Sequence, residues 1–228
     1  MQPSFSNPMR SLKDQSAVVL PSLLQCDFGN LAREIELLED AGVKALHLDV
    51  MDGHFVPNLS YGMPIVAAVR KLTKLPLDVH LMISEPAKYI PQFVDAGADC
   101  LTIHAEIDGD LTKILDSIRS AGVLAGIALN PATPLTLVEP ILSDCDLLLI
   151  MSVDAGFGGQ AFNPVALEKL RLAKELMPHL LLEVDGGVNR KTIASCREAG
   201  AQLCVVGSAI FGQENYQQAL VELTGAME

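Results

Sequence analysis

Four side chains of two chemical kinds, imidazoles and carboxylates, lie at the ends of apolar stretches of this chain. They are His47, Asp49, His80 and Asp185. Side chains alternate along an extended strand, so His47 and Asp49 fall on the same face of theirs. A set of two imidazoles and two carboxylates suits Zn²⁺, tolerates Fe²⁺, Mn²⁺ or Co²⁺, and leaves coordination positions open for oxygens of a substrate. We therefore predict that these four residues hold one divalent metal ion, with Zn²⁺ favoured.

A purely structural explanation competes for each of these residues taken alone. A single histidine in an apolar strand is more often a hydrogen-bonded core residue than a ligand. A structural zinc site, by contrast, would be closed and rich in cysteine. The five cysteines, at positions 26, 100, 145, 196 and 204, are scattered without a CxxC pair. This pattern is typical of reduced core residues, and it leaves the His/Asp set as the metal candidate.

Eight apolar, β-prone runs recur along the chain and would carry these residues. They are Ala17 to Leu20, Ala45 to Val50, Leu77 to Met82, Cys100 to His104, Leu124 to Leu129, Asp146 to Met151, Leu180 to Val184 and Leu203 to Val206. Helical patterns lie between them, four ending in an Ala-Gly pair at Gly42, Gly97, Gly122 and Gly200, where glycine stops a helix. We expect Asn189 to cap the helix that ends at Gly200.

Eight strands in alternation with helices are the number that closes a (β/α)₈ TIM barrel. An open doubly wound sheet is the alternative, and it would usually show G-x-G-x-x-G after the first strand. Here that strand runs into Pro21-Ser22-Leu23-Leu24 instead. The sequence therefore predicts the α/β class, with a single TIM barrel.

Length and composition bound the remaining possibilities. A chain of 228 residues, 50% hydrophobic and 19% charged, fits one domain. We expect the barrel to cover residues 17–228 and residues 1–16 to be a loosely held N-terminal arm. No apolar run reaches the roughly 20 residues of a membrane helix, and the arm lacks the hydrophobic segment of a signal peptide. The net charge of −12 disfavours nucleic acid and anionic lipid. A cytoplasmic protein without nucleic-acid or membrane partners is expected.

Glycine-rich segments follow the sixth, seventh and eighth predicted strands, on the rim of the barrel where the carboxyl ends of all strands meet. They contain Gly156, Phe157, Gly158, Gly159, Gly186, Gly187, Gly207 and Ser208. An isolated glycine pair is more often a tight turn. Loops seven and eight of a barrel, however, are the usual phosphate seat, where backbone amides can bind the anion without Lys or Arg. We predict a phosphate site there and a mobile lid at Gly156 to Gly159.

A metal ion, two carboxylates and a phosphate seat together indicate epimerisation of a ketose phosphate. A cation chelated by a ketone and a neighbouring hydroxyl acidifies the adjacent carbon and stabilises the enediolate. One aspartate then removes a proton from one face, and the other returns a proton to the opposite face. Metal ligation favours an ionised aspartate whereas the returning acid must be protonated, so Asp49 and Asp185 are expected to titrate as a coupled pair.

At these residues the chain resembles the ribulose-phosphate 3-epimerase family, metal-dependent (β/α)₈ enzymes that interconvert ribulose 5-phosphate and xylulose 5-phosphate. The resemblance runs from about Val18 to Phe211. It is carried by PSLL (21–24), HLDVMDGHFVPN (47–58), DVHLM (78–82), HAE (104–106), NPATP (130–134), GFGGQ (156–160), EVDGGV (183–188) and VGSAIF (206–211).

The resemblance implies roles for individual residues. His47, Asp49, His80 and Asp185 would bind one metal ion per subunit, and Asp49 and Asp185 would be the acid/base pair. Ser22 and His80 would contact the sugar, and the glycine loops would hold the phosphate. Met51, Met82 and Met151 fall where the family places methionine sulfurs around the enediolate, although their spacing is equally compatible with packing. The resemblance also implies a homo-oligomer.

One position departs from the family pattern. The sixth loop usually contains proline before GFGG, whereas this chain has Ala155. Loss of that proline frees the loop backbone, so closing the lid is expected to cost more ordering entropy. The reaction type is not affected.

Three rival functions share parts of this pattern. Allulose-6-phosphate 3-epimerase uses the same chemistry on a six-carbon ketose. A decarboxylase or aldol-type synthase built on D-x-K-x-x-D would need lysine where Asp49-Val50-Met51-Asp52 has methionine. A non-catalytic sugar-phosphate-binding barrel would lack a ligand or acid/base residue, and none is missing.

Overall fold

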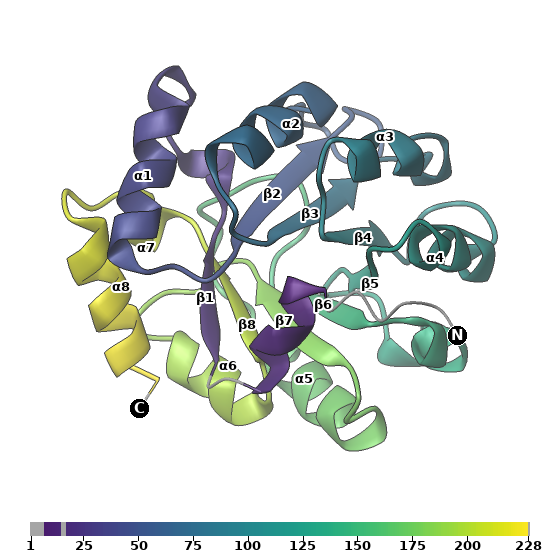
Figure 1. Ribbon diagram of the computed structural model, residues 1–228. Helices are drawn as coiled ribbons and strands as arrows, with labels where there is room; N and C mark the ends of the chain where they lie inside the picture. Colours follow the sequence, from purple (N-terminus) through teal and green to yellow (C-terminus); the bar gives the residue numbers. More distant parts are fainter. Residues whose placement is uncertain (1–6, 15–16, 228) are drawn as a thin grey trace.

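The computed structural model describes residues 7–14 and 17–227, which form a barrel of eight parallel strands ringed by helices (Figure 1). The strands are β1 Val18–Pro21, β2 Leu46–Met51, β3 Leu77–Met82, β4 Cys100–His104, β5 Leu124–Leu129, β6 Leu147–Met151, β7 Leu181–Asp185 and β8 Leu203–Val206. Their order in the sheet is β1-β8-β7-β6-β5-β4-β3-β2. A parallel bridge between Ser22 and His47 joins the two end strands. The predicted single TIM barrel is confirmed.

The strands are buried on both faces, as expected for a parallel sheet covered by helices. Seven of the eight strands are buried at every position, and in β7 only the last residue, Asp185, is partly exposed. Four strands match the predicted bounds, β6 begins one residue late, and β1, β2 and β7 are shifted by one residue toward the C-terminus. Met51 and Asp185 therefore lie within their strands, at the rim.

The connections are mostly α-helical. The α-helices are α1 Leu31–Ala41, α2 Met63–Leu72, α3 Ile90–Asp95, α4 Leu111–Ser120, α5 Val165–Leu176, α6 Ile193–Ala199, α7 Ser208–Phe211 and α8 Tyr216–Gly225. Short 3₁₀ helices are η1 Pro8–Asp14, η2 Leu23–Gln25, η3 Phe28–Asn30, η4 Pro86–Lys88, η5 Leu135–Leu137 and η6 Glu139–Asp144. Between β5 and β6, η5 and η6 replace an α-helix, since prolines at 131, 134 and 140 interrupt the helical hydrogen bonds.

The predicted glycine stops occur where expected. Gly42 and Gly200 adopt left-handed backbone conformations, with φ of 89° and 117°, directly after α1 and α6. The predicted cap of α6 was wrong. The residue before the helix is Thr192, whereas the Asn189 side chain accepts a hydrogen bond from the Lys191 amide in a turn three residues upstream. An Asx turn competes here with capping for the same side chain.

The floor of the barrel, opposite the rim, is closed by η1. Residues 1–6, 15 and 16 of the expected arm lie outside the described residues. In the described part, Met9 and Leu12 are buried against inward-facing side chains such as Leu147, Leu181 and Leu203. Gln202 also donates a hydrogen bond to the Lys13 carbonyl. This segment is packed onto the barrel by apolar contacts. Among the described residues, no helix is both long and apolar enough to cross a bilayer.

Candidate active site

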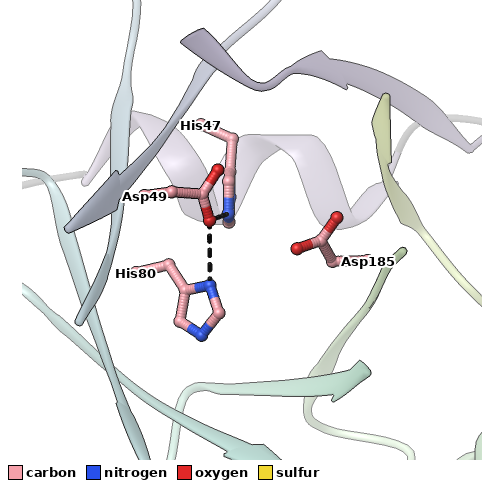
Figure 2. A group of neighbouring side chains, drawn as sticks. All are labelled: His47, Asp49, His80 and Asp185. Atoms are coloured by element: carbon pink, nitrogen blue, oxygen red, sulfur yellow. Dashed lines mark hydrogen bonds and ion pairs between the residues drawn. The ribbon is translucent and has the colours of Figure 1, made fainter. Parts of the chain in front are cut away.

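The four residues predicted as metal ligands converge inside the rim of the barrel (Figure 2). One ligand atom from each of His47, Asp49, His80 and Asp185 lies within 4.8 Å of the others. His47 and Asp49 come from β2, His80 from β3 and Asp185 from β7, on the other side of the barrel lumen. Both histidines are fully buried, and Asp49 is 4% exposed. Strand alternation thus places His47 and Asp49 on one face, and closure of the barrel brings His80 and Asp185 to them.

The orientation of His47 is fixed from below by a carboxylate. His47 Nδ1 lies 2.6 Å from Asp78 Oδ2, and both side chains are fully buried. The opposite ring nitrogen, Nε2, has no hydrogen-bond partner among the described residues, and it lies 3.3 Å from Asp49 Oδ1. When Nδ1 donates its proton to Asp78, the Nε2 lone pair points at the centre of the cluster. This is the arrangement usual for a metal-binding histidine.

Glu183 lies on the same layer as Asp78 and completes a second buried group. Its Oε1 is 3.2 Å from His47 Nδ1, and neither Glu183 oxygen has a hydrogen-bond partner among the described residues. Burial and the charge of Asp78 raise the pKa of Glu183 well above its usual value. Burial alone lowers the pKa of His47, but the charges of Asp49 and Asp78 outweigh it and raise that pKa well above the usual value. The layer thus favours positive charge at His47.

Asp78 and Glu183 lie within the DVHLM and EVDGGV motifs, and no role was predicted for either. A usable signal was present. Asp78 precedes His80 by two residues, and Glu183 precedes Asp185 by two, so each pair shares one face of its strand. Inward-facing acids directly below predicted ligands would have identified the supporting layer.

His80 is held by a second chain of polar contacts. Its Nδ1 lies 3.2 Å from Asp49 Oδ1, and its Nε2 lies 2.8 Å from His104 Nε2. His104 Nδ1 lies in turn 3.0 Å from Glu106 Oε2, and the Phe55 ring packs on His104 with a centroid distance of 4.7 Å. Burial lowers the pKa of His104 to about 4, so its ring is neutral near pH 7. A neutral His104 can donate to only one of its two partners.

Glu106 connects this chain to the loop after β5. Its Oε1 accepts hydrogen bonds from the Asn130 amide at 2.8 Å and from Thr133 Oγ1 at 2.5 Å. Burial raises the pKa of Glu106, but hydrogen bonds from His104, Thr133 and Asn130 outweigh burial and lower it to about 2. Lys169 Nζ donates to the carbonyls of Asn130 and Thr133 from the other side. The loop is therefore fixed at both faces.

The two aspartates differ in their electrostatic setting. Burial raises the pKa of Asp49, but His47 and His80 outweigh it and hold that pKa well below its usual value. Burial, followed by the charge of Asp49, raises the pKa of Asp185 to about 7. Ser22 Oγ donates to Asp49 Oδ2 at 2.6 Å, and the Asp49 amide donates to the Tyr61 hydroxyl oxygen at 3.0 Å. The surroundings thus favour the ionised form of Asp49, whereas they bring the pKa of Asp185 close to neutral pH.

A cavity of about 240 Å³ opens from this cluster toward the glycine loops. Of the predicted residues, its lining includes Ser22, Asp49, Met51, Met82, Met151, Gly156, Phe157, Gly158, Gly159, Asp185, Gly186, Gly187, Gly207 and Ser208. His47 and His80 lie behind this surface. Sequence reasoning missed several lining residues, among them Gln25 and Asn189. Met51, Met82 and Met151 were predicted either to line the site or to be packing residues. They do both, since they line the cavity and are at most 5% exposed.

The loop after β6 closes one side of the cavity and is tied to its neighbours by few hydrogen bonds. Asn58 Nδ2 donates to the Gly156 carbonyl at 2.8 Å, and the Ala155 amide donates to Asn130 Oδ1 at 3.1 Å. The Phe157 side chain is 52% exposed. Gly187, in the next loop, has a φ of 62°, and a Cβ there would lie 2.5 Å from the Phe162 amide nitrogen. Backbone, and not side chains, therefore forms much of this wall.

The donor set fits a divalent metal ion. Two imidazole nitrogens and two carboxylates converge, and the unpartnered Nε2 of His47 lies in the middle of them. With both imidazoles neutral, the two carboxylates leave negative charge in a low-dielectric layer, and a cation would balance it. The residues present can supply both the ligands and the second layer that orients them.

Comparisons with known proteins agree with this geometry. Residues 18–211 match the model of the ribulose-phosphate 3 epimerase family. Ribulose-phosphate 3-epimerase of Bacillus subtilis is 48% identical over 91% of this chain and 98% of its own, and that of Synechocystis is 47% identical over 90% and 92%. Among solved structures, 3-hexulose-6-phosphate synthase from Salmonella typhimurium superposes with a TM-score of 0.71 at 16% identity, covering 92% and 98% of the two chains. That likeness shows the fold alone.

Proposed function

This chain belongs to the ribulose-phosphate 3-epimerase family and is an isomerase, and from that premise we propose that it inverts C3 of ribulose 5-phosphate to give xylulose 5-phosphate. The observation that carries the proposal is the meeting of Asp49 and Asp185, from opposite strands, at one His/Asp cluster beside a glycine-lined cavity. A planar intermediate held there has a carboxyl group on either side. Inversion needs that arrangement, since one group must remove a proton and the other must return one.

His47 Nε2, His80 Nδ1 and the carboxylates of Asp49 and Asp185 would hold a divalent metal ion, for which Zn²⁺ is the favoured candidate. When bound, such an ion supplies Lewis-acid stabilisation of negative charge on the substrate oxygens. Asp49 is suited to act as the base because its neighbours keep its pKa low. Asp185 is suited to return a proton because its pKa of about 7 allows it to carry one. Reversal of these roles serves the reverse reaction.

The surroundings support this chemistry. Ser22 donates to Asp49 and lines the cavity, so it can orient that carboxylate and contact the sugar. Met51, Met82 and Met151 place apolar surface beside the reacting carbon, which keeps water from the intermediate. The amides of the loops at Gly158, Gly187 and Gly207 would bind the phosphate, and the loop at Gly156 to Gly159 would close over it.

The test begins with protein purified without chelator. Its metal content is measured, and xylulose 5-phosphate formation from ribulose 5-phosphate is assayed before chelation, after chelation and after Zn²⁺ is restored. About one metal ion per chain, with activity lost and regained in step, is the expected result. Full activity in metal-free protein would refute the metal-dependent mechanism. Allulose 6-phosphate assayed in parallel separates the pentulose epimerase from its six-carbon rival, and no turnover of either would favour a binding protein.

The homo-oligomer implied by the resemblance and the cytoplasmic location expected from the composition stay predictions. So does the choice of Zn²⁺ over Fe²⁺, Mn²⁺ or Co²⁺, since the same N/O ligand set accepts all four.

A further inference from the structure

The cavity has an electrostatic problem at its phosphate end. The ionisable side chains that line it are Asp49, Asp154 and Asp185, all acidic, and none of the described lining residues is Lys or Arg. The chain as a whole carries a net charge of −12. A phosphate dianion must therefore be held by neutral donors that point into the cavity. Side-chain donors matter here because each adds a directed hydrogen bond to those of the backbone.

Three side-chain amides lie among the described lining residues: Gln25, Gln160 and Asn189. Two of them already donate to protein. Gln160 Nε2 donates to the carbonyls of Asp154 and Phe157, and Asn189 Nδ2 donates to the Gly187 carbonyl. Gln25 makes no side-chain hydrogen bond within the described part of the chain, although it is partly buried. Of the three amides, it is the one with neither N–H group donating to protein among the described residues, so both remain available to a ligand.

The position of Gln25 is set by two of the loops predicted to bind phosphate. A Cβ built on Gly158 would lie 2.3 Å from Gln25 Nε2, and one built on Gly207 would lie 3.2 Å from Gln25 Cδ. Neither glycine has a positive φ. Their lack of a side chain is therefore explained by the neighbouring Gln25 amide and not by a left-handed backbone. The amide lies between the loop after β6 and the loop after β8.

We propose that Gln25 is a ligand of the substrate's phosphate, donating a hydrogen bond from Nε2 while it spans the loops at Gly158 and Gly207. This inference rests on the proposed function, and it assigns the phosphate end a determinant outside the glycine loops. Gln25 ends η2, directly after the Ser22 turn. One short segment thus contributes Ser22 to the reacting end and Gln25 to the phosphate end, and its length fixes the distance between them.

The test compares Gln25→Leu, which removes the donor at similar volume, with Gln25→Glu, which replaces it with a negative charge of the same shape. Gln213→Leu and Gln213→Glu serve as controls, because Gln213 is exposed just after α7 and does not line the cavity. Inorganic phosphate is titrated calorimetrically into the full-length, metal-loaded proteins. We expect Gln25→Leu to weaken phosphate roughly 10-fold, the usual scale for one hydrogen bond to a charged group, and Gln25→Glu to weaken it further. The Gln213 variants should stay within about twofold of wild type, as for surface substitutions.

Kinetics provide the second readout. The KM for ribulose 5-phosphate should rise in parallel with the phosphate dissociation constant while kcat changes little, because the contact is remote from the reacting carbon. Unchanged phosphate affinity in Gln25→Leu would overturn the assignment, and so would a fall in kcat at constant KM, which would mark a loop latch. Failure of this inference can be distinguished from failure of the proposed function. Phosphate binding that depends on Gln25 in a protein without turnover would preserve this inference alone, and turnover with phosphate affinity indifferent to Gln25 would preserve the function alone.

Discussion

The two ends of the cavity are built in opposite ways. At the reacting end, His47, Asp49 and His80 are side chains of interior strands, at most 4% exposed and oriented by further buried polar groups. At the phosphate end the wall is loop backbone, and Phe157 at its edge is 52% exposed. Proton transfer needs groups fixed within a fraction of an ångström, whereas a phosphate must enter and leave. In the proposed function, the rigid sheet therefore carries the chemistry and the loops carry the binding.

The largest effect is expected from the acids of the rigid end. Asp49→Asn or Asp185→Asn should lower kcat by roughly 10²–10⁴-fold, the range attributed to a general acid or base, while the thermal midpoint shows a retained fold. Steady-state assays with ribulose 5-phosphate measure this. Asp52→Asn is the matched control, because Asp52 follows Asp49 closely but accepts hydrogen bonds from the amides of His54 and Ser84. Wild-type rates in either site variant would remove the two-acid mechanism.

The supporting layer should show the next largest effect. Asp78→Asn weakens the carboxylate that fixes His47, so metal affinity should fall roughly 10–100-fold, as for other second-layer substitutions. Competition with a chelator measures the affinity, and the absorption spectrum of the Co²⁺-loaded protein should change with the ligand geometry. Thr102→Val is the control, since Thr102 is equally buried and inward-facing on β4. If both variants bind metal equally well, Asp78 has no orienting role.

At the phosphate end the effect should appear in binding. A side chain at Gly207 would press on Gln25, so Gly207→Val should raise the KM for ribulose 5-phosphate by roughly 10-fold, about 1.4 kcal/mol, with little loss of kcat. Gly62→Val is the comparison, because a Cβ at Gly62 meets nothing within 4 Å. An unchanged KM in Gly207→Val would contradict an anion site at this loop.

The smallest effect is expected at the departure in the sixth loop. Ala155→Pro would restrict the backbone, worth about 0.4–1 kcal/mol, but would remove the hydrogen bond from the Ala155 amide to Asn130, worth about 0.5–1.5 kcal/mol. The two nearly cancel, so the melting temperature should shift by no more than about 4 °C and kcat by a few-fold at most. A change in kcat beyond tenfold would show that this residue controls the lid.

The same contrast explains how much the sequence could predict. Period-two alternation is a local rule, and it located the strands and grouped His47 with Asp49. It did not identify contacts between strands, so the pairing of Asp78 with His47 and the chain from His80 through His104 to Glu106 were missed. Gln25 was missed because its proposed role depends on two loops more than 130 residues away. The packing of η1 and the Asx turn at Asn189 likewise depend on neighbours that periodicity does not specify.

The central claim is that one cation lies between two acids at the rigid end. Anomalous diffraction at the zinc edge, from crystals of the Zn²⁺-loaded protein, tests it most directly. The account predicts a single peak per chain, about 2.0–2.2 Å from His47 Nε2, His80 Nδ1 and oxygens of Asp49 and Asp185. A peak among His47, Asp78 and Glu183 instead, or none inside the barrel, would contradict it.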